Sequence, residues 1–205
     1  MKLHTLSLGA LDTNCYIVQD DNGRGMIIDP ADQADVILAL IEKEHLSIDA
    51  VVLTHAHFDH MLAAKELCAV TNATLCVGAR DEAALADPMR NLSGLFQICQ
   101  PIRLKADRTL VEGDELIIGD VSLTVLETPG HTPGCICLVG EGVLFSGDTL
   151  FYSSIGRLDF PGGDVSAMQA SLQRLATLPA ATVVYPGHGE PTTIGREATY
   201  NPYMR

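Results

Sequence analysis

The sequence predicts an α/β fold, because short runs typical of β-strands alternate with segments that carry the periodicity of helices. The strand-like runs are rich in β-branched and apolar residues, and many of them end at Gly or Asp, which favour turns. Three segments place apolar residues at helical spacing, and each stands between groups of these runs. A length of 205 residues, 47% of them hydrophobic, suits a single domain over residues 1–205 with a continuous core.

The first half of the chain is predicted to open with an antiparallel meander and to continue as alternating helices and strands. The turn-rich segments GALDTN and DDNGRG separate the first three strands. A helix is predicted to follow, because Asp29 and Asp32 flank its start, Pro30 stands near its first turn, and apolar residues recur at helical spacing beyond them. The predicted elements are strands at 3–8, 15–19 and 25–29, a helix at 29–45, a strand at 50–53, a helix near 60–70 and a strand at 74–78.

The second half of the chain is predicted to form a second sheet that ends with a helix and a strand. It begins with a less regular stretch near 87–108. In the last predicted helix Asp164 caps the start, while Met168, Leu172 and Leu175 share one face. The predicted elements are strands at 114–120, 121–130, 134–140 and 142–148, a helix at 164–178 and a strand at 181–185.

The charge of the chain excludes several classes of partner. Asp and Glu number 26 against 13 Lys and Arg, and the resulting charge of −13 repels nucleic acid and anionic membranes, so we expect a small-molecule substrate. No window approaches the roughly 18 apolar residues that a membrane helix requires. The N-terminal segment MKLHTLSLGALD is interpreted as a strand rather than a signal peptide, which predicts a cytoplasmic protein.

The six cysteines have no CxxC spacing, and five of them lie among apolar neighbours, as reduced core cysteines of cytosolic proteins commonly do. Cys135 and Cys137 stand two positions apart on a predicted strand and would share a face. They could bind a metal there, but a core face is the more common role for such a pair.

Metal-capable side chains follow four of the predicted strands directly. The segment THAHFDH, residues 54–60, follows the strand at 50–53, and three further runs end in Gly and then His or Asp. Because functional side chains collect on loops held by a rigid sheet, four strand ends can bring these groups to one rim. The candidates are His55, His57, Asp59, His60, His131, Asp148 and His188.

Seven candidate ligands are too many for one tetrahedral ion, which takes four. Two ions fit better, with His55 and His57 approaching one ion, Asp59 and His60 serving a second, and Asp148 bridging them. Imidazole and carboxylate ligands predict zinc, with iron or manganese as alternatives.

In this order and spacing, THAHFDH, TPGHTPG, SGDTLF and YPGHG resemble the motifs of the metallo-β-lactamase superfamily, and the resemblance runs from Cys15 to the C-terminus. It implies a four-layered αβ/βα sandwich, in which two mixed sheets carry flanking helices and the metals lie at one edge between the sheets. It also implies a role for Asp29, in IIDP, which matches an acidic position that supports the ligands. The alternative is that Asp29 is only an acid at a helix N-terminus. The implied ligand sets are His55, His57 and His131 for the first metal, Asp59, His60 and His188 for the second, and Asp148 for both.

Within this superfamily, the residues favour the glyoxalase II-like hydrolases. β-Lactamases typically carry Cys or Ser at the bridging position and act outside the cytoplasm, whereas this chain has Asp148 and no expected signal peptide. Nucleases of the superfamily bring extra domains and basic surfaces. The segments SSIGRLDFPGGD, residues 153–164, and PTTIGREATYNPYMR, residues 191–205, resemble the short glyoxalase II-like hydrolases. The C-terminal helical domain with which full-length glyoxalase II helps bind glutathione is absent from residues 1–205.

The loop after Asp148 departs from the glyoxalase II pattern. Where those enzymes offer a Lys and a Tyr to glutathione, this chain has Arg157 and Asp159, and a further Tyr position is occupied by Glu190. Arg157 can still bind a carboxylate, whereas Asp159 would repel one. Alternatively, the two residues form an ion pair within the loop.

The resemblance implies a dinuclear hydrolase that cleaves S-2-hydroxyacylglutathione, a thioester, to glutathione and a 2-hydroxy acid. Asp59 would orient the hydroxide that attacks the carbonyl, and the thiolate would leave without a strong acid. The alternatives are a hydrolase of another thioester or ester, a persulfide dioxygenase with a single iron, and a metal-storage or metal-sensing module. The dioxygenases share GR-x-DF but continue without the PGGD of this chain. The oligomeric state is not indicated.

Overall fold

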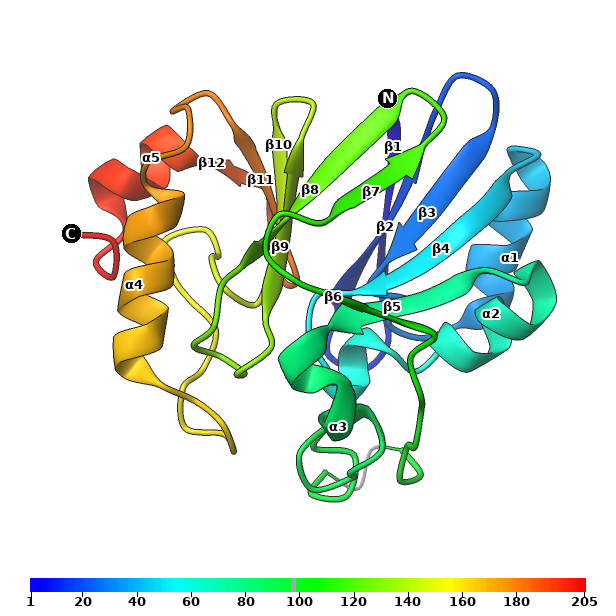
Figure 1. Cartoon of the computed structure of the whole chain (residues 1–205), viewed down its shortest axis with the longest axis horizontal. Helices are drawn as coiled ribbons and strands as arrows, with labels where there is room; N and C mark the ends of the chain where they lie inside the picture. The colour runs from blue at the N-terminus through cyan, green and yellow to red at the C-terminus, as the bar shows by residue number, and fades with distance from the viewer. Residues whose placement is uncertain (97–98) are drawn as a thin grey trace.

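The computed structural model describes residues 1–96 and 99–205, and its two mixed sheets pack face to face (Figure 1). Strands of the first sheet are, in spatial order, β1 (Lys2–Leu8), β2 (Thr13–Gln19), β3 (Arg24–Ile28), β4 (Ser47–Leu53), β5 (Thr74–Gly78) and β6 (Arg108–Leu110). Strands of the second sheet are, in spatial order, β12 (Thr192–Thr193), β11 (Val183–Pro186), β10 (Val143–Gly147), β9 (Ile136–Gly140), β8 (Val121–Glu127) and β7 (Glu115–Ile118).

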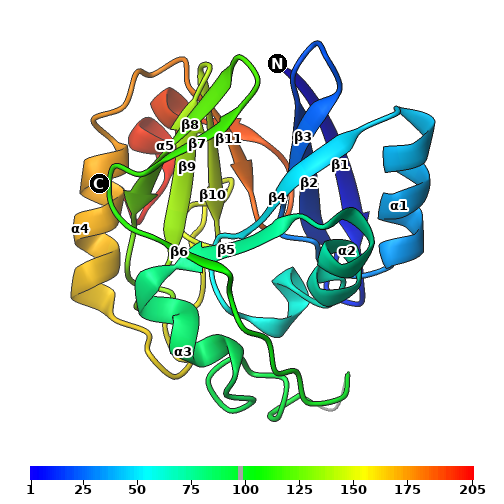
Figure 2. The ribbon, with the colours of Figure 1, turned by 45° about the vertical axis from the view of Figure 1, so that its right-hand side comes forward.

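Helices cover the outer faces of both sheets (Figure 1). The first sheet carries α1 (Ala34–Lys43) and α2 (Ala64–Thr71), and the second carries α4 (Val165–Leu175) and α5 (Ile194–Tyr200). The short helix α3 (Glu82–Leu85) follows β5 and lies at one end of the sheets (Figure 2). The order helix, sheet, sheet, helix confirms the four-layered sandwich predicted above.

Three apolar clusters fill the spaces between these four layers. Strand β2 shows how one sequence serves two of them, because alternate side chains of a strand point to opposite faces. Cys15 and Ile17 pack towards α1 and α2, whereas Tyr16 and Val18 pack between the two sheets. Full burial on both faces explains why the middle of β2, CYIV, shows no alternation of apolar and polar residues.

Strand direction brings several strand ends to one edge. Strands β3, β4 and β5 run parallel, as do β10 and β11. Strand β8 is antiparallel to β9, which is antiparallel to β10, so β8 also runs in the direction of β10. Within the second sheet the carboxyl ends of β8, β10 and β11 therefore lie on one side, and the residues that follow them meet the segment after β4, as the sequence predicted.

Two predicted helices begin later than expected. Helix α1 starts at Ala34, because Asp29 continues the line of β3 by donating its backbone N–H to Val52 O, and Pro30 follows. Asp29 is therefore not an acid at the start of α1. The helix expected near 60–70 is a 3₁₀ turn at Phe58–His60, followed by α2 from Ala64.

Elements near the end of the irregular stretch and in the tail were not predicted. The stretch near 87–108 reaches the start of β6 at Arg108, and its positions 97 and 98 lie outside the described residues. In the tail, the Thr193 hydroxyl accepts from the backbone N–H of Arg196 and caps α5. Asp164 caps α4 as predicted, by accepting from Ala167 N. Within the described ranges, no helix combines the length and apolar character needed to cross a membrane.

Candidate metal centre

The predicted ligands gather at the edge between the two sheets. The segment that contains His55, His57, Asp59 and His60 follows β4, and it faces loops from the second sheet. His131 follows β8, Asp148 follows β10 and His188 follows β11. Three overlapping groups of side chains place their ligand atoms within 4.8 Å of one another: His55, His57 and His131; His55, His60 and Asp148; and Asp59, His60 and His188.

The first group consists of buried imidazoles. His57 Nδ1 lies 3.1 Å from His55 Nε2 and 2.8 Å from His131 Nε2. Burial, with the His131 ring beside it, lowers the pKa of His57 to about 3, and burial also holds the pKa of His55 well below its usual value. Both rings are therefore neutral near pH 7, which is the form that binds a metal.

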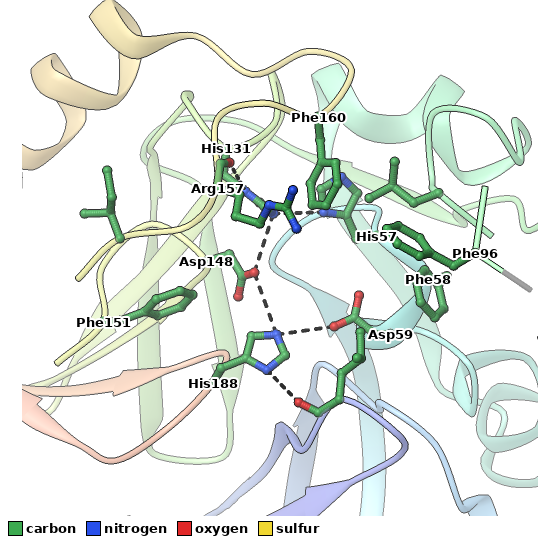
Figure 3. Close-up of a pocket in the computed structure, with 13 residues that line it drawn as sticks. His57, Phe58, Asp59, Phe96, His131, Asp148, Phe151, Arg157, Phe160 and His188 are labelled. Atoms are coloured by element: carbon green, nitrogen blue, oxygen red, sulfur yellow. Dashed lines mark hydrogen bonds and ion pairs between the residues drawn. The ribbon is translucent and has the colours of Figure 1, made fainter. Parts of the chain in front are cut away.

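The group of Asp59, His60 and His188, called the second group from here on, mixes imidazole and carboxylate. Asp59 Oδ2 lies 3.5 Å from His60 Nε2 and 3.3 Å from His188 Nε2. Asp148 stands between the two groups, with its oxygens 3.4 Å from His60 Nε2, 3.5 Å from His131 Nε2 and 3.8 Å from His188 Nε2. Figure 3 shows Asp59, Asp148, His131 and His188 pointing toward one another. This placement of Asp148 suits the bridging position.

The atoms around His60 are suited to bind a cation. His60 Nδ1 faces the Asp29 carboxylate at 3.0 Å, which holds the proton on that nitrogen. The opposite nitrogen, Nε2, faces the carboxylates of Asp59 and Asp148 and is the nitrogen available to a metal. Among the described residues, neither His60 Nε2 nor Asp148 Oδ1 has a hydrogen-bond partner, although both atoms are buried. A positive ion between these two atoms would bind both of them, so the residues here fit a metal.

Backbone carbonyls orient two further histidines. His131 Nδ1 donates to Arg157 O at 2.6 Å, and His188 Nδ1 donates to Leu11 O at 3.1 Å. Because a carbonyl only accepts, Nδ1 carries a proton in both rings, and Nε2 is the nitrogen available to a metal. Contacts of this kind set both the tautomer and the direction of a metal-binding histidine.

Asp29 lies behind the ligands. Its carboxylate accepts from the backbone N–H and the hydroxyl of Thr54, each at 2.7 Å, in addition to facing His60 Nδ1. The residue is 1% exposed and adopts a left-handed backbone with φ of 51°. This arrangement supports the role that the sequence resemblance implied for Asp29.

Glycine at position 187 is required by the closeness of the groups. A Cβ there would meet Asp148 Oδ1 and would lie 2.7 Å from His60 Cε1. Both approaches are shorter than a van der Waals contact, so any side chain at this position would push these two residues apart. The PGHG sequence thus supplies space for the site as well as the ligand His188.

Sequence reasoning missed three polar residues of β2 that hold the second group. Thr13 Oγ1 donates to Asp59 Oδ2 at 3.0 Å. Asn14 donates to the carbonyls of Pro186 and Gly189, and the Tyr16 hydroxyl donates to Pro186 O at 2.6 Å. These contacts tie the loop that carries His188 to the first sheet. The available signal was the pair Thr13–Asn14 in a strand whose other residues are mostly apolar, because Asn is depleted in strands unless it has a partner.

A cavity of about 330 Å³ opens over these groups (Figure 3). Polar side chains from both groups form its floor, and aromatic side chains form much of its wall. The aromatic residues are Phe58, Phe96, Phe151 and Phe160. A mostly apolar cavity with a few convergent polar groups is the usual form of a small-molecule site.

Arg157 and Asp159 form the ion pair that the sequence left as an alternative. Arg157 Nε and Nη2 donate to the two oxygens of Asp159 at 2.9 and 2.7 Å. Both side chains are largely exposed, at 63% and 66%. Arg157 also borders the cavity and lies 4.3 Å from the centre of the Phe160 ring, whereas Asp159 does not line the cavity.

The cysteine pair considered as a metal site is not part of the centre. Strand β9 begins at Ile136, so Cys135 lies outside it, and Cys137 packs among apolar residues towards α4. In the described part of the chain, none of the three ligand groups contains a cysteine.

The two groups are expected to respond differently to acid. Burial alone would lower the pKa of His60 and His188, but the neighbouring carboxylates Asp59 and Asp148 raise both pKa values above their usual range. A metal must displace those protons, so second-site affinity should fall first as the pH is lowered through neutrality towards the usual histidine pKa of about 6.5. Zinc content measured after equilibrium dialysis across this range checks the order. Simultaneous loss of both ions would contradict it.

Comparison with known proteins places the chain in a family. Residues 8–188 match the model of the metallo-beta-lactamase superfamily. The chain is 35% identical to the probable metallo-hydrolase YqgX of Bacillus subtilis, over 100% of this chain and 98% of the relative. It is 31% identical to the hydroxyacylglutathione hydrolase GloC of Haemophilus influenzae, over 100% and 98%.

Solved structures agree with this placement. The BLEG-1 B3 metallo-beta-lactamase superposes with a TM-score of 0.94 at 36% identity, covering 99% of each chain. TTHA1623, in a di-iron-bound form, superposes with a TM-score of 0.88 at 37% identity, covering 98% of this chain and 99% of that one. ETHE1 from Myxococcus xanthus gives 0.81 at 31%, covering 98% and 84%. The chain belongs to the metallo-beta-lactamase superfamily, and its clustered histidines and aspartates fit a dinuclear metal site.

Proposed function

We propose that this protein is a dinuclear metal-dependent hydrolase of thioesters, with S-2-hydroxyacylglutathione as its substrate. The observation that carries the proposal is the cavity directly over the two ligand groups, whose floor includes His57, Asp59 and Asp148. A storage or sensing site needs the ligands but has no use for such a cavity. The similarity to a hydroxyacylglutathione hydrolase supports the choice of substrate.

In the proposed reaction, the two groups of side chains hold the metal ions and position the attacking water. Zinc ions held there would polarise the thioester carbonyl and lower the pKa of a coordinated water. Asp59 borders the cavity, and we assign its carboxylate to orient the attacking water, while the Thr13 hydroxyl fixes the position of Asp59 Oδ2. The leaving thiolate has a pKa of about 8.5, far below that of an alkoxide, so the reaction needs no strong general acid.

Arg157 and the aromatic wall would bind the rest of the substrate. The guanidinium stands at the border of the cavity, where it can meet a carboxylate of the thiol carrier. Its pairing with Asp159 competes with that contact, because both oxygens of Asp159 already occupy the guanidinium. The exposed pair is weak, since such pairs contribute roughly 0–1 kcal/mol.

Release of Arg157 is expected to improve binding of an anionic thioester. In Asp159→Asn the competing charge is removed, so KM for S-lactoylglutathione should fall by about two- to fivefold while kcat stays constant. Steady-state kinetics on the zinc form test this. Two controls are Asp21→Asn, which removes an exposed charge in the β2–β3 turn, and a neutral N-acetylcysteamine thioester. An unchanged KM for the anionic substrate would show that Arg157 does not contact it.

The function itself is tested by S-lactoylglutathione hydrolysis with zinc-loaded protein and oxygen excluded. Saturable release of glutathione is expected. No turnover with two zinc ions bound would overturn the proposal, and two further assays then identify the reaction. Oxygen consumption with glutathione persulfide by an iron-loaded sample tests a persulfide dioxygenase, which the di-iron form of TTHA1623 makes worth measuring. Hydrolysis of a chromogenic cephalosporin tests the activity named for BLEG-1.

A further inference from the structure

Asp81 is a buried carboxylate that lies outside the three ligand groups. It follows β5 at the end of the short 3₁₀ turn Ala79–Asp81 and is 1% exposed. Its oxygens accept three hydrogen bonds. Oδ2 accepts from Ala56 N at 3.0 Å and Thr132 Oγ1 at 2.7 Å, and Oδ1 accepts from Gly134 N at 2.8 Å.

The three donors belong to the two segments that carry the first ligand group. Ala56 stands between His55 and His57 in the loop after β4. Thr132 directly follows His131, and Gly134 lies two positions further, in the loop between β8 and β9. One carboxylate therefore joins a loop of the first sheet to a loop of the second, and it does so at the residues next to all three imidazoles.

The backbone is shaped to bring Asp81 this close. A Cβ at Gly134 would lie 2.6 Å from Asp81 Oδ1 and 2.7 Å from Asp81 Cβ, which is closer than real side chains approach. At Gly78, a Cβ would collide with Gly134 O. The end of β5 and the loop after His131 thus touch through two glycines, and a larger residue at either position would separate them.

The second ligand group is held by other residues. Asp29 faces His60, Thr13 donates to Asp59, and Leu11 O accepts from His188. None of these contacts involves Asp81. A change at position 81 should therefore alter the spacing of the first group and leave the second group in place.

We propose that Asp81 is the positioning residue of the first metal site. It sets the separation of His55 and His57 from His131, and with it the affinity of that site for a divalent ion. The inference rests on the metal centre and not on the choice of thioester, so it can be tested without any substrate.

The test is a zinc titration of Asp81→Asn in competition with a chromophoric chelator, which gives a dissociation constant for each site. His57→Ala and His188→Ala assign the two constants to the first and second sites. In Asp81→Asn an amide nitrogen must face one of the three donors, so the first-site constant should rise about ten- to a hundredfold. The second-site constant should stay within about twofold, a selectivity that general destabilisation would not produce.

Two further variants make the result decisive. Asp20→Asn is the matched control, because Asp20 is also buried and accepts from the backbone N–H groups of Asn22 and Arg24, in a hairpin turn remote from the site. Both of its zinc constants should match those of the unaltered protein. Thr132→Val removes only one of the three hydrogen bonds and should weaken the first site by a few-fold, even if Asp81→Asn does not fold.

The proposal would be overturned by unchanged zinc constants in Asp81→Asn or, where that variant does not fold, in Thr132→Val. Equal weakening of both sites would also overturn it. Absence of thioester hydrolysis in the zinc-loaded unaltered protein, together with selective weakening of the first site in Asp81→Asn, would reject the proposed substrate and leave the role of Asp81 intact.

Discussion

Asp148→Asn is expected to abolish thioester hydrolysis and to reduce bound zinc from two ions per chain to one or fewer. Asp148 is the carboxylate that lies within 4 Å of imidazoles from both ligand groups, and its Oδ1 is buried without a hydrogen-bond partner among the described residues. An amide keeps the shape but loses the charge and one of the two ligand oxygens. Metal ions supply several kcal/mol of transition-state stabilisation, so kcat/KM should fall by on the order of 10³-fold or more.

The measurement combines zinc content after dialysis with kcat/KM for S-lactoylglutathione. Asp114→Asn is the control, since the Asp114 carboxylate accepts from Val111 N and pairs with Arg108 at 3.9 Å, both outside the ligand groups. Its zinc content and kcat/KM should be unchanged. His57→Ala should behave like Asp148→Asn, because His57 Nδ1 contacts both other imidazoles of the first group. Full activity in either variant would reject the assigned ligand set.

Asp29→Asn is expected to weaken the second metal site selectively, by about ten- to a hundredfold. The Asp29 carboxylate accepts from Thr54 on one side and holds the His60 ring on the other. An amide must point a donor at one of these groups, which rotates His60 or changes its tautomer. Asparagine is the informative choice, because it tolerates the φ of 51° at this position, whereas alanine would add backbone strain.

The pattern should be the reverse of that for Asp81→Asn, with the first-site zinc constant unchanged and the second-site constant raised. Loss of activity should follow the loss of the second ion and be restored by excess zinc. Glu141→Asn supplies the control, because Glu141 is exposed and has the same φ of 51° in the turn between β9 and β10. Equal zinc constants in Asp29→Asn and the unaltered protein would show that His60 is positioned without Asp29.

Local signals explain why most of the architecture was predictable. In β2, alternation is hidden because both faces are buried, yet the β-rich run and its flanking turns still mark the strand. Helix α4 was predicted because Asp164 caps it and its apolar residues have one face to cover. Helices α3 and α5 are too short to show a period, at four and seven residues, so the sequence offered little to detect them.

For the metal centre, too, one part was predictable from the sequence and another part was not. The sequence by itself determined the ligand types and their places after strand ends, because these depend on residue chemistry and local turns. Only the tertiary structure decided how closely these ligand groups approach one another, that Arg157 is paired with Asp159, and that Asp81 and Asn14 contact the loops that carry the ligands. Asp81 reaches Ala56 across 25 positions and Asn14 reaches Pro186 across 172. Contacts over such separations depend on how the two sheets pack, and a pattern read along the chain carries no information on that packing.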